Sequence, residues 1–483
     1  MQTVEIDRSD VQGPLVSAYS HLKRSAYIFL QFHDAVGARQ WLAELLPSIS
    51  NGTLWPTGPD GKKIKPQESI NIAFTYPGLA ALGLSHQTLD SFLPPYTSGA
   101  AARANVVGDV GESAPEDWEF GGPNTAPVHA MLMVQSRGPR HLKDLEKVLD
   151  DLVTASRGAV TILASEYGYR REEAKEHFGF HDGLSQPNIA GVGIQKADGQ
   201  LVTETGEFVL GYLNAYGLYP TSPIVPVSQD PRGILPKFPE GALPDCRDFG
   251  KHGTYVVYRK LEQDVAKFWQ SIQQTADGDQ TEMLKVSSKY LGRWPSGTPI
   301  TLSPDVDPVR YSDENDFRFM PLDPDGIRCP VGSHIRRANP RDSRVNDTPE
   351  SSLNTSSRHR VLRRAMMYGE PLIAAEETEW PRAPMNVEDD GVPRGLQFVV
   401  LNADIQRQFE FVQQTWFNIP TFNAEFSTKD PFVGDNNGTG YMTLQDEPYR
   451  RRIPHMPRFV RTRAAAYLFM PSLTALRYIA EIC

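Results

Sequence analysis

The sequence lacks the features that mark several large classes of protein. Its 483 residues include only three cysteines, Cys246, Cys329 and Cys483, which are too few and too scattered for a disulfide framework or a zinc site. No apolar run reaches the roughly 18 residues that a membrane span needs. The N-terminus shows no charged segment followed by an apolar one, the pattern of a secretion signal. We therefore expect no membrane span and a reducing, cytoplasmic setting.

Basic charge is also scarce. The formal net charge is −10 and the sequence pI is about 5.6, whereas a general nucleic-acid binder usually carries a basic face. We therefore expect no nucleic-acid partner. Apolar residues make up 40% and charged residues 22%, which is ordinary for a globular protein. The length allows two domains, and the sequence gives no indication of an oligomeric state.

One local pattern recurs along the chain: an apolar β-like run, a short turn and an amphipathic helical stretch. The β-like runs lie at 26–32, 71–76, 128–136, 253–261 and 395–403. The first and fourth units match in spacing, because Tyr27 precedes Trp41 by fourteen residues and Tyr255 precedes Trp269 by the same fourteen. This repetition predicts an α+β sheet with helices on one face, built twice.

Two stretches interrupt this pattern. Residues 217–252 are dense in proline and glycine, which predicts a long connection. Residues 373–394 predict an inserted surface loop.

A first candidate site is HFGFHDGLSQPNIAG, at 177–191. Gly179 and Gly183 bracket Asp182. Glycine lets the backbone approach a bulky ligand closely, so this turn can present a carboxylate into a cavity. An ordinary Asp-Gly turn is the simpler interpretation of this segment taken alone.

Two basic segments follow. The segment at 325–344, DGIRCPVGSHIRRANPRDSR, places His334 before several arginines. An imidazole nitrogen can ligate haem iron, and guanidinium groups can pair with the haem propionates. The segment at 356–371, SSRHRVLRRAMMYGEP, contains Arg363 and Tyr368. Taken alone, the first segment is typical of a basic surface loop, and the second is typical of solvated arginines on a helix.

Together, these segments resemble the dye-decolourising peroxidase family. The GxxDG signature of that family matches Gly179–Gly183, its proximal segment matches CPVGSHIRRANPR, and its distal arginine segment matches VLRRAMMYG. The resemblance extends over nearly the whole chain through NIAFTYPGLAALGL, GEFVLGYLNAYG, RQFEFVQQTW and YLFMPSLTAL. It implies two ferredoxin-like α+β domains, each an antiparallel sheet with peripheral helices. We expect them at 1–235, which contributes the GxxDG motif, and at 236–483, which binds haem.

The resemblance implies a role for each matching residue. His334 would be the axial ligand of a haem b iron, and Arg336 would pair with a haem propionate. Asp182 would be the distal acid–base residue and Arg363 the distal arginine. A second set would support these four: Gly183 beside the cofactor, Leu396 and Phe398 in the apolar distal wall, and Asp430 bonded to the axial histidine, with Asp435 as the next candidate.

Two aromatic residues match positions of functional aromatics in the family, and one residue departs from the family pattern. Trp416 and Tyr368 lie where related enzymes place radical-forming aromatics, although both could be plain packing residues. Ala365 stands where many relatives carry glycine.

The activity that the resemblance implies is a haem-dependent peroxidase. It would reduce hydrogen peroxide and oxidise dyes, phenols and other aromatic donors through a ferryl intermediate. An acidic activity optimum is expected, because a carboxylate base titrates near pH 4.

Two other functions are compatible with parts of the sequence. The main one is a haem-binding or iron-release protein without sustained peroxidase turnover, but simple haem binding needs neither Asp182 nor Arg363. The second is a metal-dependent hydrolase. His177 and His181 stand four apart, but Gly179 and the Asp-Gly pair make a helix there doubtful.

Overall fold

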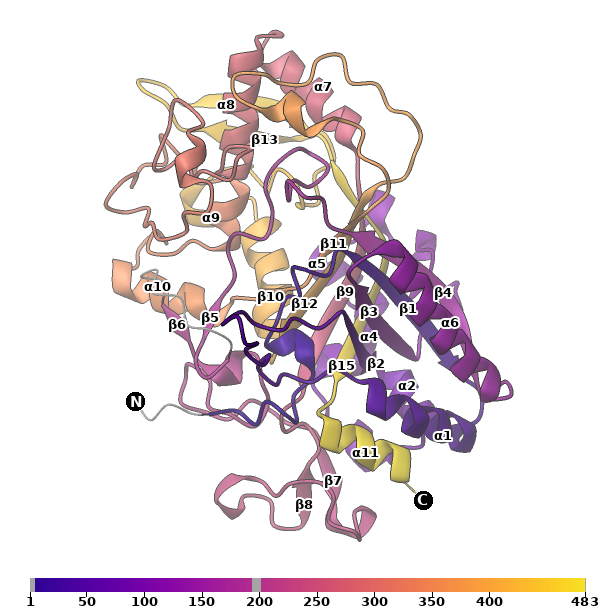
Figure 1. The fold of residues 1–483 in the computed structure, drawn as a ribbon. Helices are drawn as coiled ribbons and strands as arrows, with labels where there is room; N and C mark the ends of the chain where they lie inside the picture. Colours follow the sequence, from indigo (N-terminus) through magenta and orange to yellow (C-terminus); the bar gives the residue numbers. More distant parts are fainter. Residues whose placement is uncertain (1–4, 193–200, 483) are drawn as a thin grey trace.

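The computed structural model describes residues 5–192 and 201–482. Its centre is a sheet of nine strands in the order β10-β12-β11-β4-β1-β3-β2-β15-β9, and β9 also pairs with β12, so the sheet closes into a barrel (Figure 1). All strand pairs in this sheet are antiparallel. The strands are β1 (Arg24–Phe32), β2 (Glu68–Phe74), β3 (Ala130–Ser136), β4 (Val160–Tyr169), β9 (Thr254–Gln263), β10 (Leu362–Arg363), β11 (Met366–Tyr368), β12 (Gly395–Asn402) and β15 (Val460–Met470).

The barrel consists of two similar halves. In the first half the spatial order is β4-β1-β3-β2, with α1 (Ala35–Leu45) between β1 and β2 and α6 (Pro139–Ala155) between β3 and β4. The second half repeats this order as β15-β9-β12-β11, with α7 (Val265–Thr275) after its first strand. This is the βαββαβ plan of a ferredoxin-like unit. The predicted fold class, two antiparallel α+β units, is confirmed.

The strands of the barrel bury both of their faces. Along β1, Ile28 and Leu30 belong to the core beneath the helices, whereas Tyr27 and Phe29 belong to the core inside the barrel. There the Phe29 ring lies 4.8 Å from the ring of Tyr258 on β9. Successive side chains of a strand point to opposite faces, so one strand supplies both cores.

The flanking helices begin where the sequence supplies caps. The Asp34 carboxylate accepts a hydrogen bond from the amide of Gly37 at the start of α1, and Pro139 occupies the first turn of α6. In α6 four leucines share the face that packs on the barrel. Leu142, Leu145 and Leu149 are buried and Leu152 is partly buried against the same core.

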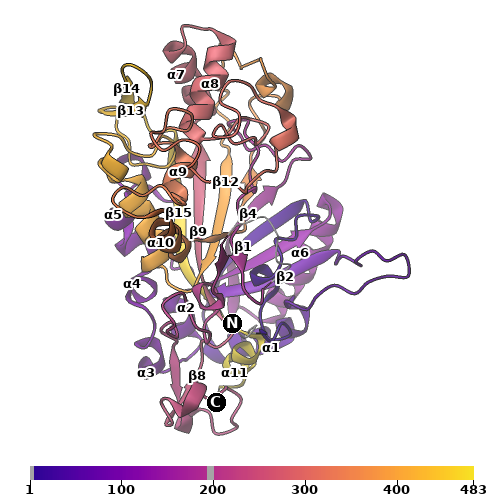
Figure 2. The same ribbon diagram turned by 90° about the vertical axis from the view of Figure 1, so that its left-hand side faces the viewer.

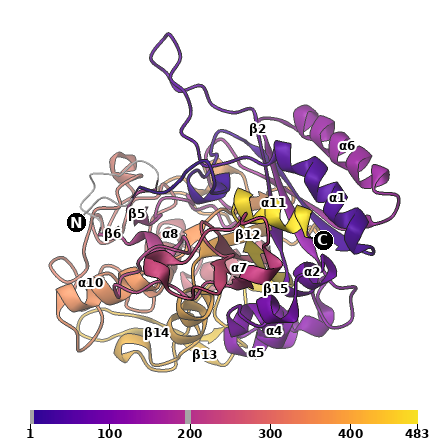
Figure 3. The same ribbon diagram turned by 90° about the horizontal axis from the view of Figure 1, so that it is seen from below.

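The remaining helices and strands surround the barrel (Figures 1 and 2). Between β2 and β3 lie α2 (Tyr76–Ala81), α3 (His86–Leu89), α4 (Pro94–Ala102) and α5 (Ala104–Val107). The others are α8 (Gln280–Leu291), α9 (His334–Ala338), α10 (Pro349–Arg358), α11 (Leu473–Glu481), β5 (Asn188–Ile189), β6 (Val202–Thr203), β7 (Ile224–Pro226), β8 (Cys246–Asp248), β13 (Gly440–Leu444) and β14 (Arg451–Met456). Figure 1 places α9 and α10 on one side of the barrel and α1 and α6 on the other, and Figure 3 shows the same separation of α10 from α1 and α6.

Three details differ from the expectations. The helical pattern after β12 forms two π-helical segments, η10 (Gln406–Glu410) and η11 (Val412–Phe417). The connection at 217–252 contains the β7–β8 hairpin. The 373–394 segment is only partly a surface loop, because Thr378 is fully buried and its hydroxyl donates to the carbonyl of Gly179.

Strands from both expected domains share this one sheet, and the boundary at 235/236 stays a prediction. Within the described residues, no helix is both long and apolar enough to cross a membrane.

The two joints between the halves are narrow. β2 meets β15 at the single pair Phe74 and Phe469, and β4 meets β11 at the pair Tyr169 and Met367. Phe74 is fully buried. Replacing Phe74 by Ala should therefore lower the free energy of unfolding by roughly 3–5 kcal/mol, because it opens a cavity at the joint.

Urea unfolding followed by circular dichroism measures this loss. The control is Val148→Ala on the solvent side of α6, where the side chain is 56% exposed. Its effect should stay within about 0.5 kcal/mol. Similar losses of unfolding free energy in both variants would show that Phe74 at the joint stabilises the protein no more than a surface residue does.

Candidate active site

A cavity lies against the outer face of the second half of the barrel. The volume inside it that is open to the centre of a water molecule is ≈ 270 Å³. Arg259, Leu261 and Gln263 of β9 line it, as do Leu396 and Phe398 of β12. These residues alternate along their strands, so each strand turns one face to the cavity and the other to the barrel interior. The predicted wall residues Leu396 and Phe398 therefore do face a common cavity.

His334 is the first residue of α9 and lines this cavity together with Ile335 and Ala338. Its Nδ1 lies 2.9 Å from Oδ2 of Asp430, and since a carboxylate accepts, Nδ1 donates. The ring of Phe417 stacks on the imidazole at 5.3 Å. With Nδ1 engaged, Nε2 is the nitrogen that can bind a ligand in the cavity.

Asp430 is fully buried, and two amides hold it from the other side. Its Oδ1 accepts hydrogen bonds from the backbone of Phe432 and Val433, each at 2.9 Å. Burial alone would raise the pKa of this carboxyl, but His334, the Val433 amide and Arg337 outweigh it and hold the pKa below its usual value. Asp430 is therefore ionised, and the predicted contact with the histidine is confirmed.

A buried arginine fixes the segments behind His334. The guanidinium of Arg337 donates to the carbonyls of Trp416 at 2.5 Å, Thr428 at 2.6 Å and Gly332 at 3.2 Å. Arg337 thus joins the loop before α9, the π-helical segment η11 and the loop that carries Asp430. This arrangement orients the His334–Asp430 pair.

Asp182 and Arg363 meet in the same cavity from distant parts of the chain. Nη1 of Arg363 lies 2.9 Å from Oδ1 of Asp182, which also accepts from the amide of Gly183 at 2.6 Å. The Asp182 side chain is 35% exposed. Removal from bulk water favours its neutral form, but Arg363 and the Gly183 amide outweigh this effect and lower the pKa of the Asp182 carboxyl. The site therefore holds a carboxylate beside a guanidinium.

Glu176 is a cavity residue that sequence reasoning missed. Its carboxyl accepts from the amides of Phe178 at 2.9 Å and Phe180 at 3.0 Å, and from Nε2 of Gln263 at 2.7 Å. Burial raises the pKa of Glu176 to about 7 against these donors, and the nearby Asp182 adds to the rise. Glu176 folds the turn that carries Asp182 and ties it to β9. An acidic residue directly before the apolar HFGF run was the available signal.

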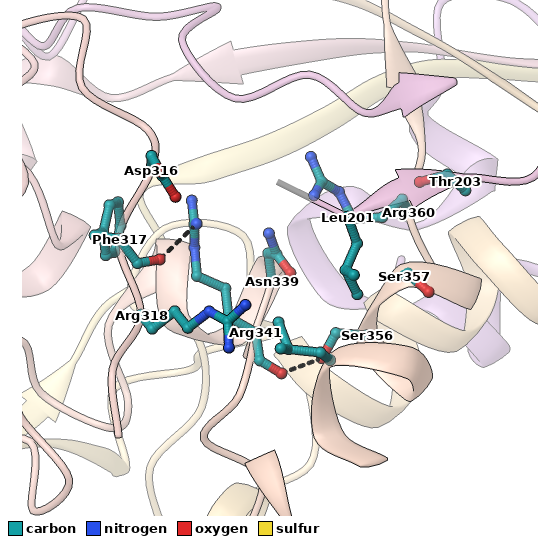
Figure 4. A pocket seen from close by; sticks show the side chains of 11 residues that line it. Leu201, Thr203, Asp316, Phe317, Arg318, Asn339, Arg341, Ser356, Ser357 and Arg360 are labelled. Atoms are coloured by element: carbon teal, nitrogen blue, oxygen red, sulfur yellow. Dashed lines mark hydrogen bonds between the residues drawn. The ribbon is translucent and has the colours of Figure 1, made fainter. Parts of the chain in front are cut away.

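Arginines surround one end of the cavity, where a smaller pocket adjoins it (Figure 4). Arg341 and Arg360 line both spaces, together with Phe317 and Asn339. Nη2 of Arg360 lies 3.4 Å from the hydroxyl of Ser185, and Nη1 of Arg341 donates to the carbonyl of Phe317 at 2.8 Å. Figure 4 shows the two guanidinium groups on either side of Asn339. This end of the cavity is suited to anionic groups.

Arg336 does not line the cavity, so the prediction that it faces the cofactor is wrong. It is 1% exposed, and its guanidinium bonds with Asp323 and with the carbonyl of Cys329 at 2.8 Å. The reason is helical phase. A residue two positions along an α-helix points about 200° away, so Arg336 points away from His334.

The two aromatic residues suggested as radical sites are both buried. Trp416 is 2% exposed and packs edge-on against His359 at 5.3 Å. Nζ of Lys260 lies 5.3 Å from the ring centre of Tyr368. The hydroxyl of Tyr368 has no hydrogen-bond partner among the described residues. Burial raises the pKa of that phenol, so removal of its proton is costly. Tyr368 is the poorer of the two as an oxidation site.

The other candidates are easily placed. Ala365 and Gly183 line the cavity. Asp435 pairs with Lys429 at 2.7 Å instead of with His334. Among the described residues, no group of His, Cys, Asp or Glu side chains could hold a metal ion, which gives the hydrolase alternative no support.

Comparison with known proteins agrees with this geometry. Residues 10–167 match the profile of the DyP dimeric alpha+beta barrel domain. The chain is 27% identical to the dye-decolorizing peroxidase of Exidia glandulosa, over 98% of this chain and 86% of that protein. It is 28% identical to the multifunctional dye peroxidase DyP2 of Amycolatopsis sp., over 94% and 92% of the two chains. The chain is therefore similar to dye-decolourising peroxidases over nearly its whole length.

Solved structures of dye-decolourising peroxidases share the fold. The fungal DyP-type peroxidase from Auricularia auricula-judae superposes with a TM-score of 0.75 at 23% identity, covering 99% of this chain and 100% of that one. An ancestral D-type dye-decolorizing peroxidase gives a TM-score of 0.76 at 24% identity, over 98% and 99%. Similarity to dye-decolourising peroxidases implies a haem cofactor.

The raised pKa of Glu176 predicts a pH-dependent stability. The folded carboxyl keeps its proton up to about pH 7, whereas an unfolded glutamate loses it near pH 4.3. Between these values the unfolded chain binds fewer protons, so stability falls as pH rises. Glu176→Gln should flatten the fall in melting temperature between about pH 5 and pH 7.

Calorimetry of the wild type and Glu176→Gln across this pH range measures the difference in melting temperature. Glu172→Gln, at an exposed side chain, is the control. Identical slopes for the wild type and Glu176→Gln would contradict the assignment.

Proposed function

We propose that the chain is a haem-dependent peroxidase that reduces hydrogen peroxide while oxidising dyes, phenols and other aromatic donors. One observation carries the proposal. A histidine held by a buried carboxylate and a carboxylate–guanidinium pair, from segments far apart in the chain, line one cavity. The relatives named as dye-decolorizing peroxidases support it, and one solved member of the family is in complex with 2,6-dimethoxyphenol.

The cavity suits haem b. Its walls are largely apolar, as a porphyrin requires, and Nε2 of His334 is left to bind iron. Arg341 and Arg360 would pair with the propionates, the role expected of Arg336. Bound iron would supply the redox chemistry for breaking the O–O bond of peroxide. The chain's own residues then have to move a proton, hold charge and orient the ligand.

Asp182 is placed to move the proton. Its Oδ1 is held by Gly183 and Arg363, which leaves Oδ2 for substrate. This carboxylate accepts a proton from one oxygen of hydrogen peroxide and returns it to the other, which leaves as water. Arg363 stabilises the negative charge that develops on the departing oxygen. One group accepts and returns the proton, so no second base is needed.

Asp430 has a supporting role. It keeps the proton of His334 on Nδ1 and fixes the plane of the ring, and its negative charge makes the imidazole a stronger electron donor.

Cys246 and Cys329 are free thiols, in keeping with a reducing setting. The cytoplasmic location stays a prediction.

Replacing Asp182 by Asn tests the proposal. The amide cannot accept the proton, so the reaction of the haem-loaded enzyme with peroxide should slow by about 10²- to 10⁴-fold. The Soret band should stay unchanged, because Asp182 does not ligate iron. Rapid-mixing spectroscopy measures the rate. His334→Ala is the companion variant, and it should alter the Soret band.

Two outcomes would reject the proposal. Slow bleaching of the wild type, without a rapid spectral change, would favour the haem carrier. The second concerns pH. Because the pKa of Asp182 is lowered, the peroxide rate should stay level down to about pH 4 and decline below it. A decline that begins near neutral pH would remove Asp182 as the base.

Trp416→Phe is expected to separate two classes of reductant. Trp416 is buried against His359, a cavity residue, so it can carry electrons to donors that cannot enter. Turnover of large dyes should fall more than turnover of small phenols. Steady-state kinetics with both donors measure this, and Trp41→Phe in α1 is the control. Equal losses on both donors would exclude the role.

A further inference from the structure

Gln263 of β9 is a buried amide in an apolar part of the cavity. It is 6% exposed and lines the cavity with Val460, its partner on β15, and with Phe178, whose ring lies 5.5 Å from that of Phe432. Oε1 of Gln263 has no hydrogen-bond partner among the described residues. A buried amide oxygen without a partner costs free energy, so we expect this one to meet a water molecule or a ligand in the cavity.

The other end of this amide is held by Glu176, which also lines the cavity. Nε2 of Gln263 donates to Oε2 of Glu176 at 2.7 Å, and the same oxygen accepts from the backbone amide of Phe178 at 2.9 Å. Oε1 of Glu176 accepts from the backbone amide of Phe180 at 3.0 Å. All three contacts use the carboxyl group as an acceptor, which suits its ionised form.

Protonation of Glu176 requires a different arrangement. A proton on Oε2 makes this oxygen a donor, and the N–H of Gln263 cannot remain opposite an O–H group. The backbone amides of Phe178 and Phe180 cannot change from donor to acceptor, but the amide of Gln263 can rotate. Its Oε1 then accepts from Glu176, and its Nε2 turns to the cavity. The cavity meets an N–H donor in place of a carbonyl oxygen.

Glu176 changes its charge in the range where this exchange matters. Burial, followed by the charge of Asp182, raises the pKa of Glu176 to about 7. Asp182 itself is paired with Arg363. Other charged or titratable side chains of the neighbouring segments have partners of their own: Lys175 with Thr378, His177 with the carbonyl of Tyr368, Arg259 with Asp109, and Arg394 with Asp390. Glu176 is therefore protonated below neutral pH and ionised above it.

We propose that Glu176 and Gln263 form a proton-controlled switch that determines whether the cavity accepts anionic ligands. With Glu176 protonated, the pair presents a neutral acid and an N–H donor, which favour a small anion or a carboxylate-bearing donor. With Glu176 ionised, the pair presents a negative charge and a carbonyl oxygen, which both disfavour such ligands.

The two effects act in the same direction, because the amide turns its oxygen to the cavity when the carboxyl gains its charge. Affinity for anions is therefore retained below neutral pH and falls as pH rises through the pKa of Glu176. Neutral hydrogen peroxide carries no charge for Glu176 to repel, so the switch selects between classes of ligand. The inference rests on the proposed peroxidase function for the ligands that enter the cavity, but the exchange of hydrogen bonds between the two side chains does not depend on it.

Fluoride is the probe of anion binding. The haem-loaded protein is titrated with fluoride between about pH 5.5 and about pH 8.5, and the Soret band gives the dissociation constant. Other groups also affect fluoride binding, so the informative quantity is the ratio of the wild-type constant to that of Glu176→Gln. This ratio should rise roughly tenfold across the range, because only the wild type gains a charge at this position.

Glu172→Gln, at an exposed side chain, is the matched control. The ratio of the wild-type constant to that of the control should not change with pH. A ratio to Glu176→Gln that also stays constant would overturn the proposal.

Gln263→Met tests the exchange of hydrogen bonds. Methionine is similar in length but cannot donate to the ionised carboxyl, so the midpoint of Glu176 protonation should rise by roughly one pH unit. Infrared spectroscopy of the carboxylic acid band measures this midpoint with or without haem, and the loss of the band in Glu176→Gln identifies it. Fluoride binding below the midpoint should weaken roughly fivefold, because the N–H donor is missing. An unchanged midpoint in Gln263→Met would overturn the switch.

The peroxide reaction of the wild type, measured by rapid mixing, separates the two proposals. If the haem-loaded wild type does not react rapidly with peroxide, the proposed function fails, while the fluoride and infrared titrations still decide the switch. If it reacts and the fluoride ratio does not change with pH, only the switch is rejected.

Discussion

The hydrogen bond between Arg363 and Asp182 joins residues 181 positions apart, and it can form only because the barrel closes. Arg363 lies in β10, which pairs with β12, and β11 pairs with both β12 and β4. Asp182 lies in the segment after β4. The joint between β4 and β11 therefore brings the acidic turn of the first half to the arginine of the second. Neither half alone could assemble the pair.

Three carboxyl groups around the cavity differ because their surroundings differ. Asp430 is fully buried, yet His334, the Val433 amide and Arg337 keep its pKa low. Asp182 is partly open to the cavity, and Arg363 lowers its pKa. Glu176 is surrounded by neutral donors only, and these do not offset its burial. Two of these carboxyl groups are thus ionised near neutral pH, and the third titrates in that range. Only a group paired with a cation or an imidazole remains ionised in this environment.

Sequence patterns predicted the parts of the site that local chemistry determines. The glycines around Asp182, the histidine of the basic segment and the strand–helix repeats all lie within short windows. The pairing of β2 with β15 and of β4 with β11 is non-local, so the repeated units indicated two sheets without indicating that they join. Asp430 could be proposed as the partner of His334 only because the family resemblance directed attention to the end of the sheet.

The errors have physical causes as well. Arg336 was assigned to a haem propionate by the family resemblance, whereas the phase of α9 turns its side chain away from the cavity, into a buried network with Asp323. Glu176 was missed because its role comes from folded hydrogen bonds with Phe178, Phe180 and Gln263, not from a motif. The segment after β12 is π-helical on both sides of Phe411, whose ring stacks on His359. Apolar periodicity in the sequence does not distinguish a π-helix from an α-helix.

A sheet that closes on itself limits where this architecture can change. No further strand can be added to the ring without breaking a pair that already exists, so new contacts have to come from the connections. In this chain the acidic turn and the histidine helix both lie in such connections. Evolution can therefore vary which donors the enzyme accepts by altering loops, while the ring keeps the reacting groups in register.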